Sequence, residues 1–547
     1  MPDTIRTRVL IVGAGPVGLA LAIELGSRSV PCLLIERNDR VGYAPRAKTT
    51  NVRTREHLRR WGIAQDLLAA SPFGADYPSD VHFVTRLGGR RLATIENAFF
   101  CRPGRCQDYA EHSQWIPQYR LEEVLKRHAE RLPGVTLRFG AECLSFAQDE
   151  NAVSAVIRDL DTGAETTVAC DYLVGCDGAK SLVRSGIGAR MLGQYGLSRN
   201  YNIVFRAPGL AGMHRHGPGI MYWQVNADMP SFMGPMDRGD KWFFMPTGVP
   251  DTVRFTDREA AAHIAKATGI DAGYEILSSD EWIASRLIAD RYRDRRVFLA
   301  GDACHLHPPF GGYGMNMGVA DAVDLGWKIA AMLQGWGGEA LLDSYEAERR
   351  PVHRFVIDEA VANHAVLSNQ LLAAGLEDDG AAGDAAREAV GRQIRTAKIR
   401  EFRSLAVVIG YRYDASPVIV DDGSEAFPID PLHYRPTARP GARAPHWWRD
   451  NGTSLYDSFG LGFTLLGLGE ADAAVLDRAR AEAQALGVPL TVVSERDPVL
   501  RELYEAPYVL IRPDQHVAWR GTDWPEQPRA LLGHVTGRDA QPTGISG

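Results

Sequence analysis

The first forty residues alternate between short apolar runs and one helical stretch, which predicts parallel strands joined by a helix. Val9 to Val12 form an apolar run suited to a buried parallel strand, and three glycines in the spacing G-x-G-x-x-G follow it. Apolar residues from 19 to 25 continue a helix, and Leu33 to Ile35 form the next strand. This order predicts a unit that binds a dinucleotide, with the pyrophosphate at the helix N-terminus.

Each glycine of this loop has a separate task. Gly13 allows the tight turn, Gly15 has no side chain where a pyrophosphate must touch the backbone, and Gly18 lets the helix lie close to the strand. Glu36 ends the second strand, where its carboxylate can accept hydrogen bonds from both hydroxyls of a ribose. This favours FAD or NAD over NADP, although Arg37 directly after Glu36 leaves some ambiguity.

Polar residues further along the chain are candidates for the same ligand. Arg46 could hold the pyrophosphate or the edge of a flavin, and the alternative is an ordinary surface arginine on a loop. Gln118 stands at the start of an amphipathic helix predicted over residues 116–132, where its amide could reach cofactor oxygens. Lys48 and Arg53 are weaker candidates for lining the same cleft.

Short alternating runs over residues 81–100, with a double-glycine turn, predict a β-hairpin that leaves the first domain. Three further predicted strands follow, and then an apolar strand that ends in Asp177 and Gly178. Asp177 is well placed for a ligand hydroxyl or a water-mediated phosphate contact, since ligands bind at the carboxyl ends of parallel strands. The alternative is that Asp177 caps the helix that follows, and the two roles are compatible.

Residues 192–283 are rich in Met, Trp, Tyr and Phe and are punctuated by Pro and Gly. We predict an antiparallel sheet with one aromatic and apolar face, which suits a pocket for a flat hydrophobic ligand. The alternative is ordinary sheet core, which is the commoner environment for each residue taken singly. His214 and His216 lie in a glycine-rich loop, where solvated histidines are the default. The candidate pocket residues are Tyr222, Trp223, Met233, Phe243 and Met245.

A second strong signal covers residues 296–333. Val297 to Ala300 predict a strand, and Asp302 follows its end, where it can accept a hydrogen bond from a ribityl or ribose hydroxyl. Two prolines fix the next loop, and glycines loosen the backbone ahead of a helix. The backbone N–H groups of residues 311–316 form the N-terminus of that helix, which favours a negatively charged ligand such as a reduced flavin.

After residue 333 the pattern is helical, and we predict that the Ala-, Gly- and Asp-rich stretch 373–386 is a loose connection between helices. From about residue 419 strands and helices alternate again. At 547 residues the chain is too long for one core, so two or three domains are expected.

Composition limits the function classes. The net charge of −7 comes from 61 basic and 68 acidic residues without long single-sign runs, which makes nucleic acid and membranes poor candidates as partners. No apolar stretch approaches a membrane span and no signal peptide precedes the first strand, so we expect a cytoplasmic enzyme. The seven cysteines form no C-x-x-C pair, so reduced thiols and no metal site are expected.

Several motifs together carry a family resemblance. GAGPVG with Glu36, then Gln118, then CDGAKSLVR, then FLAGDACHLHPPFGGYGMNMGVADAVDLGWK, resemble in order and spacing the single-component FAD-dependent aromatic hydroxylases, in the branch of phenol hydroxylases and aromatic polyketide hydroxylases. The match covers about three quarters of the chain, and the Asp177-Gly178 and Gly301-Asp302 pairs are more specific than the first glycine loop.

The resemblance implies an α/β fold with three parts. A Rossmann-like FAD-binding domain is expected over residues 1–190 and 284–400, and residues near 79–115 are expected to contribute to the substrate domain. An inserted antiparallel sheet over 191–283 is expected to form that substrate-binding domain. Residues 401–547 are similar to the thioredoxin-like tail of the same branch, and they contain no cysteine, so redox chemistry of that fold is excluded there.

The activity implied by the resemblance is hydroxylation of a phenolic or other electron-rich aromatic compound. FAD is the expected cofactor, NADH or NADPH the transient reductant, and a C4a-hydroperoxyflavin the species that delivers oxygen from O₂ in a dry pocket. Baeyer–Villiger insertion or epoxidation is an alternative within flavin chemistry, and a NAD-dependent dehydrogenase or an inactive flavin-binding protein is an alternative outside it. The choice between NADH and NADPH and the presence of a homo-oligomer are left open.

The site residues are assigned on the same basis. Asp324 stands where many relatives have asparagine, and we expect that change to affect only surface contacts of its helix. Lys48 lies in a region where phenol hydroxylases carry an acidic residue, so no catalytic base is carried over. The residues expected to bind FAD are Gly13, Gly15, Pro16, Gly18, Glu36, Arg37, Arg46, Gln118, Asp177, Asp302, Pro309, Gly312, Gly314, Met315 and Asn316. The candidate catalytic residues are Pro309, Gly312, Tyr222 and His214, and Pro309 is also expected to touch the substrate.

Overall fold

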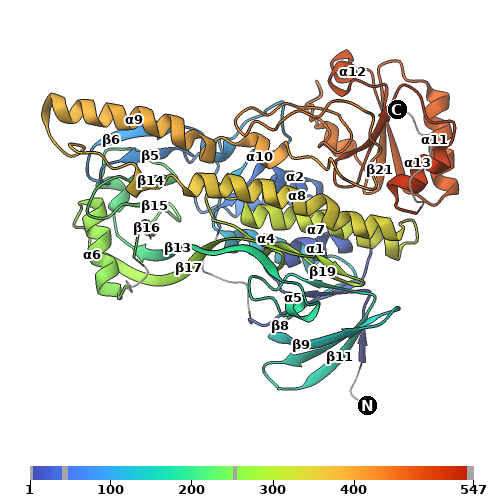
Figure 1. Cartoon of the computed structure of the whole chain (residues 1–547), viewed down its shortest axis with the longest axis horizontal. Helices are drawn as coiled ribbons and strands as arrows, with labels where there is room; N and C mark the ends of the chain where they lie inside the picture. Colours follow the sequence, from blue (N-terminus) through green and yellow to red (C-terminus); the bar gives the residue numbers. More distant parts are fainter. Residues whose placement is uncertain (1–3, 40–46, 251–254, 539–547) are drawn as a thin grey trace.

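The computed structural model describes residues 4–39, 47–250 and 255–538, and Figure 1 shows three regions along one elongated molecule. A six-stranded sheet in the order β18-β19-β12-β2-β3-β8 lies at the centre of the first region. Four of its five parallel strands are apolar and buried, as expected for a sheet with both faces covered, and the fifth, at the edge of the sheet, is only partly buried. These strands are β2 (Val9–Val12), β3 (Cys32–Glu36), β8 (Val135–Phe139), β12 (Tyr172–Gly175) and β19 (Val297–Leu299), and β18 (Arg293–Asp294) is an antiparallel edge.

Two helices of this region pack unusually close together. α1 (Pro16–Gly26) and α7 (Gly314–Leu333) cross at positions where α7 carries glycine. A Cβ built on Gly318 would lie 2.5 Å from Cγ2 of Val17, and one built on Gly326 would lie 2.6 Å from Cγ of Glu24. The predicted strands and helices of the dinucleotide unit are therefore confirmed, and α4 (Gln118–Ala129) packs beside them.

A smaller four-stranded sheet extends from this region toward the N-terminus in Figure 1. Its order is β1-β11-β10-β9, and β10 pairs antiparallel with both of its neighbours. The strands are β1 (Thr4–Arg6), β9 (Ala141–Gln148), β10 (Val153–Asp159) and β11 (Glu165–Cys170). The short helix α5 (Leu182–Gly186) follows β12.

The aromatic-rich part of the sequence forms an eight-stranded sheet in the order β20-β17-β13-β16-β15-β14-β5-β6. One face packs against α6 (Asp257–Thr268) and the other against α9 (Gly380–Phe402). The predicted hairpin supplies the last two strands, and only the pair β14 and β5 is parallel. The strands are β5 (Val81–Val84), β6 (Arg91–Ile95), β13 (Met191–Arg206), β14 (Met221–Gln224), β15 (Ser231–Pro235), β16 (Lys241–Pro246), β17 (Glu275–Ala289) and β20 (His305–Leu306).

The expectation of a loose connection over residues 373–386 is wrong in its second half, because α9 begins at Gly380. Asp379 has the extended backbone of an N-cap residue, and the alanines after it favour a helix. Arg387 donates to the carbonyl oxygens of Leu376 and Asp378, which ties the approaching chain to the first turns. Other helices of the middle region are α2 (Val52–Arg60), α3 (Ala64–Ala69), α8 (Glu339–His364) and α10 (Leu405–Ile409).

The C-terminal region has the predicted thioredoxin-like order of elements. Its sheet runs β22-β21-β23-β24, with β21 and β22 parallel and the other pairs antiparallel. The elements are β21 (Phe463–Leu468), α11 (Ala473–Ala485), β22 (Leu490–Glu495), α12 (Pro498–Tyr504), β23 (Tyr508–Ile511), β24 (Val517–Gly521) and α13 (Pro528–Val535). Among the described residues, no helix combines the length and the apolar character needed to cross a membrane.

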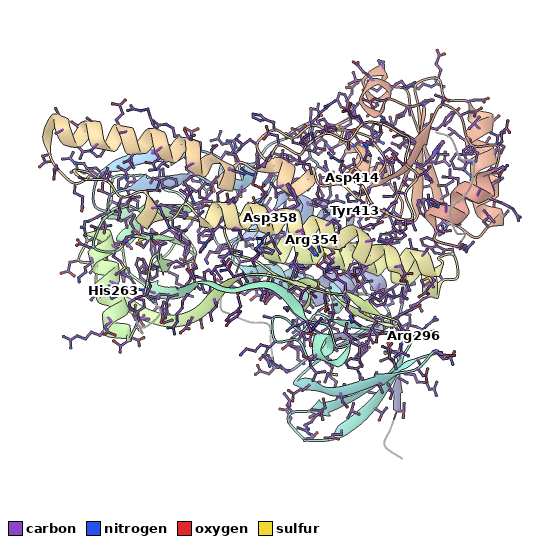
Figure 2. All side chains as sticks on the ribbon, viewed as in Figure 1. His263, Arg296, Arg354, Asp358, Tyr413 and Asp414 are labelled. Atoms are coloured by element: carbon purple, nitrogen blue, oxygen red, sulfur yellow. The ribbon has the colours of Figure 1, made fainter. Side chains whose placement is uncertain are left out.

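A buried ionic cluster joins the C-terminal region to α7 and α8. Arg512 donates to Glu348 at 2.6 Å and to Asp324 at 3.0 Å, and Lys328 donates to the same two carboxylates. Asp324 is only 1% exposed, so the expectation that it affects only surface contacts is wrong. Although burial opposes ionisation, Arg512 and Lys328 lower the pKa of Glu348 to about 2. The guanidinium of Arg512 also lies 5.1 Å from the ring of Tyr413, which Figure 2 labels beside α8.

A second set of ionic contacts joins the C-terminal region to α2. Arg443 donates to both oxygens of Glu56, which is fully buried within α2. Arg53, also in α2, donates to the backbone of Asp514 and to the side chain of Gln515. The C-terminal region is therefore attached through charged groups that water does not reach.

We expect Arg512→Met to lower the free energy of unfolding by about 3 to 5 kcal/mol, because it leaves buried carboxylates short of a partner. Urea denaturation of the purified protein measures the change. The control is Arg480→Met, which breaks an exposed ion pair with Asp477 and should stay within about 0.5 kcal/mol of the parent. Equal effects of the two substitutions would contradict the structural importance of the cluster.

Candidate functional site

The glycine loop after β2 has the geometry that close packing and ligand access require. Gly13 has φ +106°, and a Cβ there would lie 2.4 Å from the carbonyl oxygen of Cys176. A Cβ on Gly18 would lie 1.9 Å from the carbonyl oxygen of Gly13. At Gly15, by contrast, a Cβ would meet no atom within 4 Å. The loop therefore packs against protein backbone at Gly13 and Gly18. At Gly15, directly before α1 begins with Pro16, there is free space that a ligand could occupy.

Glu36 lies over this loop. Its Oε2 accepts from the backbone N–H of Ala14 at 2.9 Å, and its Oε1 accepts from the N–H of Asn38 at 3.0 Å. Oε1 also accepts from the side-chain amide of Asn38 at 2.6 Å, so Oε2 is the oxygen that retains a lone pair for a ligand hydroxyl. Arg37 is exposed beside it, and Arg46 lies outside the described residues.

Three strand ends meet at this edge of the six-stranded sheet. β12 pairs with both β2 and β19, which places the residues after each of these strands side by side. A Cβ on Gly13 would lie 3.1 Å from Cα of Asp177, and Gly301, before Asp302, approaches Val17 of α1. The structure thus brings together the glycine loop, Asp177 and Asp302, as the sequence predicts. Asp177 also accepts from the N–H of Val183 in α5 at 3.1 Å and from the hydroxyl of Ser181, and Ser181 itself is the N-cap residue of that helix.

The loop before α7 is held by one buried side chain. Asn316 is 2% exposed, its Oδ1 accepts from the N–H of Asn51, and its Nδ2 donates to the carbonyl oxygens of Thr49 and Gly312. Oδ1 also accepts from the hydroxyl of Thr54 at 2.7 Å, so the four bonds occupy the whole side-chain amide and Asn316 can offer a ligand only its backbone N–H. Gly312 has φ +68°, which favours glycine, and its N–H donates to the carbonyl oxygen of Pro309. The candidates Gly314 and Met315 form the first turn of α7.

Gln118 fastens a neighbouring segment. Its Oε1 accepts from the N–H of Ala47 at 3.1 Å, and its Nε2 donates to Glu122 at 2.7 Å. The next residues form the two-stranded sheet of β4 (Thr49–Thr50) and β7 (Gln114–Trp115), in which Thr49 lies opposite Trp115. The side chain of Thr49 lies 3.1 Å from the position of a Cβ on Gly312. This small sheet therefore lies directly against the loop that precedes α7.

The eight-stranded sheet separates the candidate pocket residues onto two faces. Trp223, Phe243 and Met245 belong to the cluster that contains Phe310 of the loop before α7. Tyr222 and Met233 belong to the cluster under α6, on the opposite face. The sequence pattern showed alternation but not which alternate residues face the loop.

Two of the predicted catalytic side chains, Tyr222 in β14 and His214 in the loop before it, lie away from the loop before α7. The hydroxyl of Tyr222 donates to the carbonyl oxygen of Gly217 at 2.7 Å, and its ring lies 4.9 Å from that of His214. Burial raises the pKa of Tyr222, and burial together with His216 lowers the pKa of His214 to about 4. The structure does not bring Tyr222 or His214 to Pro309 and Gly312.

A continuous row of aromatic rings, here called the aromatic row, leads to the loop before α7. Neighbouring ring centroids are 6.1 to 6.4 Å apart along this row. Its members in order are Phe99, Trp115, Phe243, Phe232 and Phe310. Sequence reasoning found only Phe243 among them, because the other rings come from separate elements.

One ammonium group lies against the aromatic row. Lys48 immediately precedes β4, and its Nζ is 4.3 Å from the ring centroid of Phe243. Its carbonyl oxygen accepts from the N–H of Ile116 at 2.8 Å, which fixes its backbone. Burial lowers the pKa of Lys48 to about 8.

A buried cluster around Asp321 supports the strand end that carries Asp302. Asp321 accepts from the N–H of Gly301, from His305, and from Nε of Arg349 at 2.8 Å. Although burial opposes ionisation, His353 and Arg349 hold the pKa of Asp321 well below its usual range. This cluster was missed by sequence reasoning, because its members are distant along the chain.

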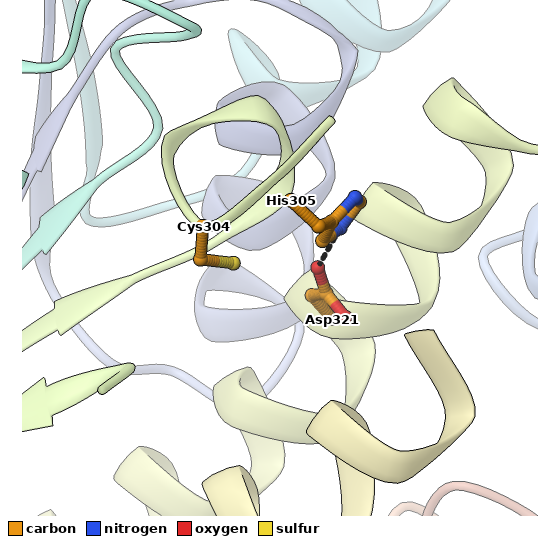
Figure 3. Close-up of side chains that lie close together, drawn as sticks. All are labelled: Cys304, His305 and Asp321. Carbon is orange, nitrogen blue, oxygen red and sulfur yellow. Dashed lines mark hydrogen bonds and ion pairs between the residues drawn. The ribbon is translucent and has the colours of Figure 1, made fainter. Parts of the chain in front are cut away.

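Figure 3 shows that Cys304, His305 and Asp321 lie close together, with their donor atoms within 4.8 Å of one another. The donors already have protein partners, since the thiol of Cys304 faces the carbonyl oxygen of Gly301 and Asp321 holds the Arg349 guanidinium. A bound guanidinium would repel a metal cation, so we assign the group an ionic rather than a metal-binding role.

Comparisons with known proteins agree with this geometry. Residues 6–360 match the family described as FAD binding domain, and residues 437–538 match the family described as aromatic-ring hydroxylase, C-terminal. The chain is 34% identical to 4-methyl-5-nitrocatechol 5-monooxygenase of Burkholderia sp, covering 97% of each. It is 33% identical to tetracenomycin B2 monooxygenase-dioxygenase of Streptomyces olivaceus, covering 98% of this chain and 99% of the relative.

The fold is similar to solved structures as well. A structure of RebC, soaked with chromopyrrolic acid and with bound 7-carboxy-K252c, superposes with a TM-score of 0.91 at 35% identity, covering 98% of this chain and 100% of that one. The named relatives are monooxygenases and hydroxylases, which does not favour the Baeyer–Villiger, epoxidation or dehydrogenase alternatives.

We expect Gly15→Ala to fold like the parent and to bind FAD at least tenfold more weakly, because the added methyl occupies open space where a pyrophosphate would approach. Gly18→Ala is the matched comparison, and it should impair folding because its Cβ would collide with the backbone of Gly13. Thermal melting and the flavin absorbance of the purified proteins measure the two effects. Parent-like FAD affinity in Gly15→Ala would contradict the placement of the ligand.

Proposed function

Because this chain belongs to the single-component FAD-dependent aromatic hydroxylases, we propose that it hydroxylates a phenolic substrate with several fused rings, held between the aromatic row and the loop from Pro309 to Gly312. The enzyme is a flavin-dependent monooxygenase, with FAD as cofactor and NADH or NADPH as reductant. The aromatic row is the observation that carries the proposed substrate class.

The residues at the edge of the six-stranded sheet fit FAD. The open space at Gly15 lies at the N-terminus of α1, where backbone N–H groups favour a pyrophosphate. Glu36 would accept from the adenosine ribose, and Asp302 would face the ribityl chain. Reduced and bound in this way, FAD supplies the activation of O₂ for transfer to an electron-rich ring.

Some residues of the proposed FAD-binding set offer backbone N–H groups to the cofactor, and others hold the neighbouring segments in position. The first turn of α7 offers N–H groups and the positive end of a 20-residue helix to negative charge. Gln118 and Asn316 hold the segments on either side of the site in place. The full set is Gly13, Gly15, Pro16, Gly18, Glu36, Arg37, Gln118, Asp177, Asp302, Pro309, Gly312, Gly314, Met315 and Asn316, with Arg46 outside the described residues.

The aromatic row supports the choice of substrate. It extends over five neighbouring rings and ends at Phe310, within the loop that would face the flavin. A planar substrate gains favourable contact from such rings, and their apolar surface excludes water from the place of oxygen transfer. Trp223 stacks on Phe232, with 4.7 Å between the two ring centroids, and so enlarges this aromatic surface. We therefore propose Trp223, Phe243, Met245 and Pro309 as substrate contacts. We leave out Tyr222 and Met233 because they face α6, and His214 because it packs on the ring of Tyr222.

A preference for substrates with several rings also agrees with the names of some of the relatives. The tetracenomycin B2 enzyme and the RebC structure with 7-carboxy-K252c carry names of multi-ring compounds, whereas the nitrocatechol enzyme is named for a single ring. A cytoplasmic location, where thiols stay reduced, fits the seven free cysteines.

Substrate preference is tested with 2-hydroxyanthraquinone and catechol as probes. We expect the three-ring phenol to accelerate NADH or NADPH oxidation at least tenfold more than catechol, because it covers more of the aromatic row. Mass analysis should show a product heavier by one oxygen atom. Faster turnover of catechol would contradict the multi-ring proposal, and turnover without oxygen incorporation would contradict hydroxylation.

The face of the sheet is tested by two adjacent substitutions in β16. Phe243→Leu removes a ring from the aromatic row and should raise KM for 2-hydroxyanthraquinone by about tenfold. Phe244→Leu makes the same change under α6 and should leave KM unchanged. Steady-state kinetics give KM, and melting temperatures show whether both variants are folded. A larger increase in KM for Phe244→Leu than for Phe243→Leu would contradict the proposal that the substrate lies on the Phe243 face of the sheet.

A further inference from the structure

We propose that His112 and Ser79 form a subsite for a second hydroxyl group of the substrate, at the end of the aromatic row remote from Phe310. This inference rests on the proposed function and deepens it, because it states which phenols the site prefers. It follows from a cavity at that end of the row and from the hydrogen-bonding groups in the wall of the cavity.

The cavity adjoins the aromatic row at Trp115. This ring is the second member of the row, and it lines the cavity together with Phe73 and Ile220. All three residues belong to the apolar cluster that also contains Phe243 and Phe310. A flat substrate that covers the row from the loop before α7 would therefore have its far end at the cavity.

The cavity is small. Its free space is about 30 Å³, which is enough for one or two oxygen-sized groups but not for an aromatic ring. Gly74 and Ala75, which are exposed in the chain after α3, form its outer wall. The cavity therefore suits a substituent of the substrate, while the rings of the substrate stay on the aromatic row.

His112 offers this cavity a hydrogen-bond acceptor. Its Nδ1 lies 2.8 Å from the carbonyl oxygen of Ser113, and because a carbonyl oxygen can only accept, Nδ1 carries the proton. Burial lowers the pKa of His112, so the ring is neutral and its Nε2 is an acceptor. In the part of the chain that the structure describes, that bond through Nδ1 is the hydrogen bond of the ring, so Nε2 is left for a ligand. An acceptor at this place selects a group that donates, such as a phenolic hydroxyl.

Ser79 offers the cavity a donor. It is 4% exposed, it lines the cavity, and its Oγ has no hydrogen-bond partner among the described residues. A buried hydroxyl without a partner costs free energy, and rotation about χ1 lets a serine turn toward a group that arrives beside it. A phenolic hydroxyl both donates and accepts, so it matches the pair formed by His112 and Ser79.

Two other polar side chains of the cavity wall already have protein partners. Gln114 accepts from Arg55 at 3.0 Å and donates to the carbonyl oxygen of Leu67 at 2.9 Å. The hydroxyl of Tyr77 donates to the carbonyl oxygen of Gly219 at 3.4 Å. These side chains hold the wall in place and leave recognition of the substituent to His112 and Ser79.

The backbone that carries His112 is fixed on both sides. The N–H of Ser113 donates to the carbonyl oxygen of Phe100 at 3.0 Å, and Glu111 accepts from Arg55 at 2.9 Å. A side chain on a held backbone loses less conformational freedom when it binds a ligand, so a hydrogen bond to Nε2 contributes more of its energy to affinity.

The test compares 2-hydroxyanthraquinone with 2,6-dihydroxyanthraquinone, whose two hydroxyls stand at opposite ends of a rigid three-ring frame. Titration of the FAD-loaded enzyme with each phenol, followed through the flavin absorbance, gives the two dissociation constants. We expect the parent to bind the dihydroxy compound about tenfold more tightly, because its second hydroxyl finds partners that the first compound leaves unpaired. This comparison within the parent needs no variant.

Substitutions then assign the preference to the subsite. His112→Asn keeps an amide donor for the carbonyl oxygen of Ser113 and removes the acceptor at Nε2, so the preference should fall from about tenfold to less than about threefold. His112→Gln places an amide oxygen near the position of Nε2 and should retain part of the preference. Ser79→Ala removes the donor and should also reduce it. Flavin content and melting temperature show whether each variant is folded.

The matched control is His263→Asn. His263 is also a half-buried histidine beside an aromatic ring, with 4.8 Å between its centroid and that of Phe255. Figure 2 labels it on α6, which covers the face of the eight-stranded sheet opposite to the aromatic row. The preference for the dihydroxy compound should therefore be the same in this variant as in the parent.

The outcomes separate the inference from the proposed function. If the parent hydroxylates both phenols but binds them equally well, or if His112→Asn keeps the full preference, the subsite is overturned and the proposed function stands. If the parent prefers the dihydroxy compound through His112 but adds oxygen to neither phenol, the subsite is supported and the proposed function is overturned. If the parent binds neither phenol, both are overturned.

Discussion

The site depends on one steric constraint: Gly13 and Gly18 must lack side chains where β2, α1 and the end of β12 meet. The carbonyl oxygen of Gly13 occupies the space that a Cβ on Gly18 would need, and the carbonyl oxygen of Cys176 occupies the space that a Cβ on Gly13 would need. Backbone thus packs on backbone, and α1 begins close enough to the strand ends for its N–H groups to face a ligand. Glu36, Asp177 and Asp302 are useful only because this packing brings their strands to one edge.

Local sequence predicted the parts of the molecule whose geometry is local. The strand, loop and helix at residues 9–26 were predicted from an apolar run and the glycine spacing, and the structure has β2 and α1 at these positions. Asp177 and Asp302 could be assigned to the same edge because each follows an apolar strand in a parallel arrangement. The family resemblance added the thioredoxin-like order of the C-terminal elements, which periodicity alone would not distinguish from other alternating folds.

Features that depend on partners far away in sequence could not be predicted. Tyr222 and Trp223 were both predicted to line the pocket, but neighbouring residues of a strand face opposite ways, and the choice of face depends on where α6 and Phe310 pack. Asp324 was expected to be exposed, because nothing near it in sequence reveals that Arg512 reaches α7 from the last domain. The same applies to Asp321, whose partners Arg349 and His353 lie one helix further along the chain.

The charged contacts between α2 and the C-terminal region have a consequence for how the protein loses its structure. Glu56 with Arg443, and Glu348 with Arg512, are buried pairs whose two members belong to different regions. Separation of the thioredoxin-like region would leave charges from both pairs inside apolar surroundings, at a cost of several kcal/mol each. This region therefore has little access to a detached state while the rest remains native, and the elements that carry the flavin site and the C-terminal sheet form one cooperative unit.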